Sequence, residues 1–157
     1  MIVKGTMDIV EETLVKARIS NRRRAIYCFH KSPDETPQRM INAFLEGTYA
    51  RPHKHENPDK LETFTILSGD IAVLTFDNLG NIEDKVILSY NGKNKIAEIP
   101  PRTWHSLVVL SQEAAVYEII EGKYNPMTHK DFAPWAPSEE DSNFRDYLGT
   151  LRNAVSS

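Results

Sequence analysis

Hydrophobic and polar residues alternate in short runs from residue 25 to residue 121, and turn-forming residues separate the runs. The runs are rich in valine, isoleucine and aromatic residues, which favour strands. We therefore predict strands over residues 25–30, 38–45, 48–55, 61–67, 71–76, 85–90, 95–99, 104–110 and 114–121. About nine short strands spaced by turn signals predict an all-β sandwich or barrel, most naturally a jelly roll.

The two ends of the chain carry different patterns. Residues 8–11 resemble a capping box that opens a short helix to about Arg18, with an apolar side formed by Ile9, Val10, Thr13, Leu14 and Ala17. After Gly122, prolines replace strand formers and predict an irregular strap across the barrel. A second helical pattern follows, with Phe144, Tyr147, Leu148 and Leu151 on one face. We expect one domain over residues 1–157: an N-terminal helix at 1–20, a β-barrel at 22–121, and a C-terminal strap and helix at 122–157.

Composition narrows the class of partner. The chain has 157 residues and a net charge of -3 with interspersed charges, which gives no global attraction to nucleic acid or to an anionic membrane. Its one cysteine, Cys28, excludes an internal disulfide, and charges interrupt the first 15 residues where a secretory signal would be apolar. No run approaches the roughly 20 apolar residues of a membrane span. We expect a cytoplasmic protein with a small-molecule ligand.

Three histidines and one glutamate form the candidate chemistry. His53 and His55 are two residues apart on a predicted strand, so both imidazoles point to the same side. Glu62 is in phase with the apolar residues of the next strand, and His105 is in phase with those of a later one. A carboxylate on an apolar face needs a partner, and a cation is suitable. The sequence therefore predicts a metal site formed by His53, His55, Glu62 and His105.

The spacing resembles the first motif of the cupin superfamily, which Gly47, His53, His55, Glu62 and Gly69 match. Six residues separate His55 from Glu62, against the three or four usual in cupins. The extra residues have turn chemistry and can loop outward, so we expect Glu62 rather than Glu56 to be the ligand.

The second cupin motif is met by Pro100 and His105, but Arg102 replaces its middle glycine. That replacement puts the turn before His105 in question, because arginine has a steric cost at positive φ that glycine lacks. Together the two motifs imply a single-domain cupin, a double-stranded β-helix.

The chain also resembles the WbuC-like cupin-fold metalloproteins associated with bacterial O-antigen gene clusters. This resemblance covers roughly residues 22 to 151 and rests on Arg22, Arg24, His30, the Gln-Arg-Met run at 38–40, Asn42, residues 49–55, Ile99-Pro100, Trp104-His105, Glu118, Gly122, Tyr124 and the Ala-Pro-Trp-Ala-Pro run at 133–137. It implies the cupin fold and a bound metal, and no settled reaction.

The donor set leaves the identity of the metal open among Fe, Mn, Ni and Zn, and imidazole also suits copper. Four protein ligands leave two free positions on an octahedral ion, where a substrate or dioxygen can bind. A tetrahedral zinc with the same ligands would be closed, and hence structural.

Further candidates surround these ligands. Tyr49 and Glu118 are candidate catalytic residues, and His30, Arg39, Asn42 and Tyr124 are candidate substrate-binding residues. Three of them have a simpler interpretation: Arg39 as a surface ion pair, Glu118 as a structural partner of a ligand histidine, and Tyr124 as a packing residue. We expect His129 to lie on the surface. The arginines at 22–24 form either a solvated turn or part of the pocket.

Two functions remain open. The first is a metal-dependent enzyme, an isomerase or epimerase or else a dioxygenase, acting on a small polar substrate derived from a sugar or bearing a carboxylate. By resemblance, its setting would be O-antigen or other surface lipopolysaccharide biosynthesis. The second is a non-catalytic cupin that binds a small ligand or a metal. Cupins commonly pair through edge strands, so the resemblance also implies a homodimer.

Overall fold

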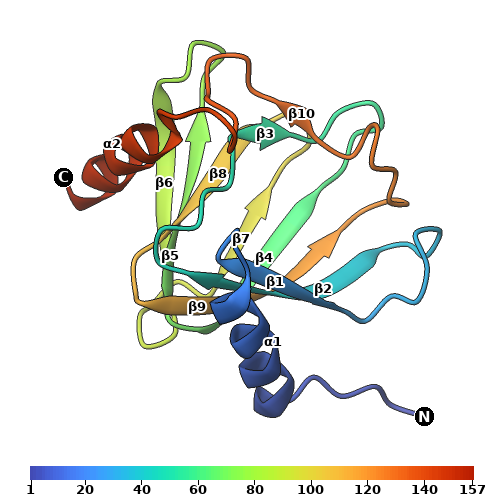
Figure 1. The fold of residues 1–157 in the computed structure, drawn as a ribbon. Helices are drawn as coiled ribbons and strands as arrows, with labels where there is room; N and C mark the ends of the chain where they lie inside the picture. Colours follow the sequence, from blue (N-terminus) through green and yellow to red (C-terminus); the bar gives the residue numbers. More distant parts are fainter.

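The computed structural model describes residues 1–157 as two antiparallel five-stranded sheets that face each other, with one helix on the outside of each (Figure 1). The helices are α1 (Met7–Ile19) and α2 (Phe144–Ser156). The strands are β1 (Arg24–Cys28), β2 (Gln38–Leu45), β3 (His53–Lys54), β4 (Glu62–Ser68), β5 (Asp70–Phe76), β6 (Ile82–Ser89), β7 (Ile96–Ile99), β8 (Trp104–Val109), β9 (Glu113–Ile120) and β10 (Asp131–Phe132). This is the predicted jelly roll.

The order of strands leaves the roll closed on one side and open on the other. One sheet has the order β1-β2-β9-β4-β7, and the other has the order β10-β3-β8-β5-β6. At one side β6 and β7 are in contact. On the opposite side the edge strands are β1 and β10, and we call the region between these two strands the open side, or mouth, of the roll.

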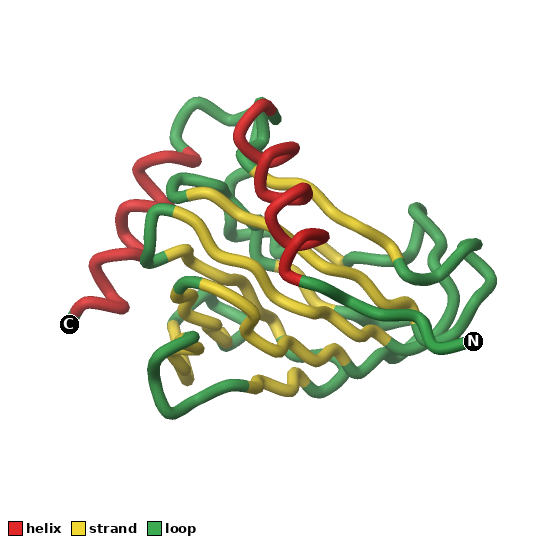
Figure 2. Tube along the Cα trace, turned by 90° about the horizontal axis from the view of Figure 1, so that it is seen from below, coloured by secondary structure: helices red, strands yellow, loops and turns green.

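Alternation along the strands separates the inner core from two outer ones. Phe44, Phe64 and Leu107 belong to the core between the sheets. On the outer face of β2, Ile41 packs under α1, and α2 packs against β5 and β8. Figure 2 shows the two helices lying on the outside of the strands. Burying each of these large side chains contributes about 1.5–3 kcal/mol. Neither α1 nor α2 is long and apolar enough to cross a membrane.

The predicted strand over residues 48–55 is wrong for most of its length. Only His53 and Lys54 join a sheet. The carbonyls before them accept hydrogen bonds from elsewhere. Arg24 donates to Tyr49 O (3.2 Å), the Ser106 hydroxyl donates to Ala50 O (2.6 Å), and the Ala133 N–H in the strap donates to Pro52 O (2.9 Å). These bonds bend the segment away from the ladder.

Two smaller predictions also need correction. The first helix begins two residues earlier than expected, because Thr6, not Asp8, is its N-cap and its side chain accepts a hydrogen bond from the Ile9 N–H (3.4 Å). The strap is not wholly irregular, since its residues Asp131 and Phe132 form β10 and pair with β3.

Candidate metal centre

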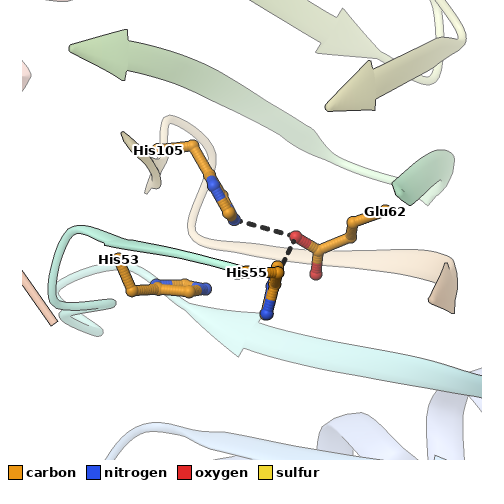
Figure 3. Close-up of side chains that lie close together, drawn as sticks. All are labelled: His53, His55, Glu62 and His105. Atoms are coloured by element: carbon orange, nitrogen blue, oxygen red, sulfur yellow. Dashed lines mark hydrogen bonds and ion pairs between the residues drawn. The ribbon is translucent and has the colours of Figure 1, made fainter. Parts of the chain in front are cut away.

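The four predicted ligands converge inside the roll. His53 on β3 lies directly opposite His105 on β8 in the sheet register, and Glu62 begins β4 in the facing sheet. One ligand atom from each of His53, His55, Glu62 and His105 lies within 4.8 Å of the other three, and all four residues are buried. Figure 3 shows the side chains pointing toward a common centre. Glu62 is in this cluster and Glu56 is not, since Glu56 pairs with Lys54.

Backbone carbonyls fix the orientation of all three imidazoles. The Nδ1 atoms of His53, His55 and His105 lie 2.9, 2.6 and 2.8 Å from the carbonyl oxygens of Arg51, His129 and Thr103. Because a carbonyl only accepts, each Nδ1 carries the proton and each Nε2 presents a lone pair. Metal-binding histidines are held in this way by their surroundings.

The inner atoms of the cluster need a positive charge between them. Glu62 Oε2 lies 2.8 Å from His105 Nε2 and 3.3 Å from His55 Nε2, so lone pairs face a carboxylate oxygen. The Nε2 atoms of His53 and His105 are buried without an aligned hydrogen-bond partner. One divalent ion would satisfy all four groups, whereas unpaired buried acceptors are costly. The donor set therefore fits a transition metal.

Burial also sets the charge state of these groups. Desolvation, with Lys130 and His105 nearby, holds the pKa of His53 well below its ordinary value, so this imidazole is neutral as metal binding requires. Burial opposes ionisation of Glu62, and protonated His105 and His55 would hold the pKa of this carboxyl well below its usual range; with both imidazoles neutral, a bound cation would have the same effect.

Arg102 adopts the left-handed conformation that its motif position demands. Its φ is 66°, and its backbone N–H donates to the carbonyl of His55 (3.0 Å), which ties the turn to a ligand strand. The Arg102 Nε atom donates to Asp59 Oδ1 (2.9 Å), in the extra residues between His55 and Glu62. An arginine thus replaces the motif glycine without displacing His105.

Glu118 and Asn42 form the wall beside the ligands. Both belong to the inward-facing set of their strands, and the Asn42 side-chain amide donates to the Glu118 carboxylate. Burial, together with the neighbouring Glu62 carboxylate, raises the pKa of Glu118 well above its ordinary value. Of the two carboxyls, Glu62 is therefore the more readily ionised and Glu118 the more readily protonated.

Tyr49 is placed away from the ligands. Its ring stacks on Phe144 of α2 with centroids 5.5 Å apart, and its hydroxyl donates to the carbonyl of Pro137 (2.8 Å). Burial raises the pKa of this hydroxyl above its ordinary value. These contacts make Tyr49 a packing residue between the barrel and α2, and its catalytic role stays a prediction.

Arg39 and His30 do not join the wall either. Arg39 is one residue out of phase with Asn42, on the outer face of β2, and its guanidinium pairs with Glu35 (2.5 Å), which is the simpler of the two interpretations. The Nδ1 atom of His30 accepts a hydrogen bond from the Arg39 backbone N–H (3.0 Å). The contacts of neither side chain include a ligand of the cluster, and their role as substrate-binding residues stays a prediction.

His129 was predicted to be a surface residue, and this is wrong. Its ring centroid lies 5.1 Å from that of His55 and 4.9 Å from that of Tyr124, which is itself 43% exposed. Burial, with His55 and Lys130 nearby, lowers the pKa of His129 to about 3. His129 therefore lies between Tyr124 and the ligand His55. Only three-dimensional contact reveals this role, because His129 lies 74 residues beyond His55.

Solved structures share the fold at low identity. CapF, the capsular polysaccharide assembling protein from Staphylococcus aureus, is 20% identical with a TM-score of 0.60, over 73% of this chain and 30% of CapF. A Klebsiella pneumoniae protein with a double-stranded beta-helix domain is 15% identical with a TM-score of 0.59, over 85% and 97% of the two chains. The Schizosaccharomyces pombe Cnp3 cupin domain is 14% identical with a TM-score of 0.50, over 64% and 62%.

These similarities show a cupin fold, as predicted. The chain spans only about a third of the length of CapF. No curated protein matches the chain. A family model does match it over residues 6–88, a segment that includes His53, His55 and Glu62. The chain belongs to this family, which is described as a domain of unknown function, DUF6016.

Proposed function

We propose that this protein is a metal-binding cupin that holds one divalent transition metal ion, Fe, Mn, Ni or Zn, through His53, His55, Glu62 and His105. The observation that carries the proposal is the convergence of four buried donor atoms, with each imidazole fixed so that its Nε2 lone pair faces the centre. When bound, the ion would supply a Lewis acid or a redox centre.

We propose further that the site acts on a small polar substrate, derived from a sugar or bearing a carboxylate. Asn42 and Glu118 would hold the substrate beside the ligands, and Glu118 is the candidate for moving a proton because its carboxyl borders the cluster. Tyr124, in contact with His129, is a candidate contact for a substrate hydroxyl. Two classes of reaction suit such a site. One is isomerisation or epimerisation, and the other is oxygen-dependent oxidation.

The suggested setting is surface polysaccharide synthesis. Its support is the resemblance to WbuC-like cupins and the likeness in fold to CapF, a capsular polysaccharide assembling protein. A CapF structure also contains an inhibitor, 3-isopropenyl-tropolone, and CapF therefore binds a small organic ligand. A single domain over residues 1–157, a cytoplasmic location and a homodimer remain predictions, and solution scattering would test the dimer.

The metal content of purified, untagged protein tests the first proposal. We expect about one equivalent of one metal by mass spectrometry, lost in His53→Ala, Glu62→Gln and His105→Ala. Glu56→Gln is the matched control, because Glu56 lies on the same connection but outside the cluster. Unselective uptake that these ligand changes leave unaltered would refute the metal site.

A second assay separates the enzyme from a non-catalytic cupin. If the bound metal is iron, substrate-dependent oxygen consumption would identify an oxygenase. Proton exchange at a sugar carbon would instead identify an isomerase or epimerase. Metal-loaded protein that binds sugar derivatives but turns none over would favour the binding module.

A further inference from the structure

A cavity of about 750 Å³ with a strongly basic lining lies at the open side of the roll. Five arginines line it, Arg22, Arg23, Arg24, Arg51 and Arg145, against two glutamates, Glu139 and Glu140. The whole chain carries a net charge of -3, so this concentration of positive charge is local. Cavities with such a lining attract and bind anions.

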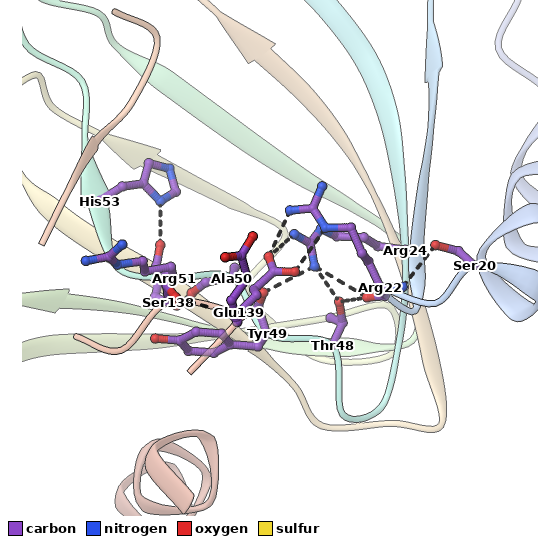
Figure 4. Close-up of polar contacts among 12 residues, drawn as sticks. Ser20, Arg22, Arg24, Thr48, Tyr49, Ala50, Arg51, His53, Ser138 and Glu139 are labelled. Atoms are coloured by element: carbon purple, nitrogen blue, oxygen red, sulfur yellow. Dashed lines mark hydrogen bonds and ion pairs between the residues drawn. The ribbon is translucent and has the colours of Figure 1, made fainter. Parts of the chain in front are cut away.

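Two of the arginines already hold a carboxylate that belongs to the strap. Arg22 donates to Glu139 through Nε (2.9 Å) and Nη2 (2.8 Å), and Arg24 donates to the same group (Figure 4). The Nη1 atom of Arg24 donates to Thr48 Oγ1 (3.3 Å) and to Tyr49 O (3.2 Å), and these bonds fix the orientation of the guanidinium. Although burial disfavours its charge, these hydrogen bonds lower the pKa of Glu139 to about 2. The two guanidiniums thus form a ready cradle for an oxyanion.

Arg51 has no carboxylate partner. Its Nη2 atom donates to the carbonyl of Ala133 (3.0 Å), while its Nε atom is buried without any partner. Its guanidinium lies 5.2 Å from the ring centre of Phe132. Because Nε is closed off from solvent, an anion in the cavity would reach Arg51 through the outer nitrogens of its guanidinium, whose charge no carboxylate neutralises.

Phe132 connects this cavity to the metal centre. It pairs with His53 across β10 and β3, and the two ring centroids are 6.2 Å apart. The Phe132 ring also contacts the Arg51 guanidinium, and Phe132 is 51% exposed. A small molecule lying along Phe132 would therefore meet the arginines at one end and the ligand cluster at the other.

We propose that the arginine cavity binds the anionic group, a phosphate or a carboxylate, of the small molecule whose other end reaches the metal centre. Glu139 occupies the cradle in the free protein and leaves when the anion binds. The inference rests on the proposed function for the second end of the ligand, while the anion site itself depends only on Arg22, Arg24 and Arg51. It names the substrate class as anionic.

Titration calorimetry with inorganic phosphate, pyrophosphate and malonate tests this proposal. We expect saturable binding of at least one probe at moderate salt. Arg22→Met and Arg51→Met should each weaken it about tenfold, the usual loss when a charge-assisted hydrogen bond is removed. Arg18→Met is the matched control, because Arg18 also binds two carboxylates, of Glu11 and Glu113, but lies against the outer face of the barrel. Tighter binding of phosphates than of malonate identifies a phosphorylated ligand, and the reverse identifies a carboxylate.

Glu139→Gln gives a change of opposite sign. Removing the internal competitor should strengthen anion binding several-fold, by the loss of one negative charge beside the ligand. Binding by Glu139→Gln alone, with none by the wild type, would overturn the proposal, as would equal weakening by Arg18→Met. Metal content, measured on the same samples, keeps the two ideas apart. Anion binding without metal would refute the proposed function and leave the anion site alone, without a ligand that reaches a metal, whereas metal without anion binding would refute the anion site and leave the proposed function intact.

Discussion

Tyr49 offers a sharp test of the structure, because a catalytic role and a packing role predict different results. Changing Tyr49→Phe removes the hydroxyl that donates to Pro137 O (2.8 Å) and keeps the ring stacked on Phe144. A neutral hydrogen bond contributes about 0.5–1.5 kcal/mol, and a half-buried carbonyl such as that of Pro137 can regain a water. We therefore expect a loss of about 1 kcal/mol.

That loss corresponds to a decrease in melting temperature of about 2–4 °C for a chain of this size. Tyr49→Ala also removes the ring, which is 2% exposed and packs against both Phe144 and Tyr147. Truncation of a buried aromatic residue costs about 3–5 kcal/mol. Urea unfolding and calorimetry measure both values, and mass spectrometry measures the bound metal in parallel.

Metal content and turnover of the two variants separate the packing role from the catalytic one. Both should retain metal at the wild-type level when folded, and Tyr49→Phe should retain any turnover that is found. A Tyr49→Phe protein with unchanged stability but with lost turnover would refute the packing role and restore the hydroxyl to the chemistry.

Other changes test separate parts of the structure. His129→Ala should leave metal content unchanged by mass spectrometry, because the hydrogen bond that orients His55 goes to the backbone carbonyl, which the substitution keeps; loss of metal would make His129 a ligand. Glu139 has a depressed folded pKa, so its contribution to stability is complete above the ordinary carboxyl value of 4.5 and is lost as pH falls through about 2; the unfolding free energies of wild type and Glu139→Gln in urea should converge as pH falls to about 2, and a constant difference would contradict this linkage. Gly69→Ala should cost more than about 2 kcal/mol, because its φ is +67° and a methyl group would overlap the Glu113 carbonyl, whereas Gly149→Ala in α2 meets nothing and should stabilise by about 0.5–1 kcal/mol in thermal unfolding. Equal effects at the two glycines would exclude this steric explanation.

The ligand cluster could be predicted because it depends on strand phase. His53 and His105 face inward because side chains alternate along their strands, and Glu62 follows the same period with Phe64. His55 lies one residue beyond β3 and still joins the cluster. The extra residues before Glu62 did not disturb this, since they loop outward and are held by Arg102. The jelly roll followed from the spacing of strands and turns.

Contacts between distant segments could not be predicted from such periods. The lead-in to β3 leaves the sheet because Arg24 and Ser106 take its carbonyls, and neither is near it in sequence. Arg39 shares a strand with Asn42, but an odd separation places them on opposite faces, a distinction that motif resemblance ignores. Likewise, nothing local to His129 indicates that it lies beside a ligand.

The hydrogen bond between His55 Nδ1 and the His129 carbonyl has a consequence for how the protein matures. During synthesis, the barrel strands through β9 leave the ribosome before the strap does, so His55 is first made without the acceptor that fixes its tautomer. A nascent chain stalled before residue 129 would present a looser set of donors to the cellular metal pool. Selectivity for the ion would then be acquired only when the last fifth of the polypeptide has emerged and folded over the mouth.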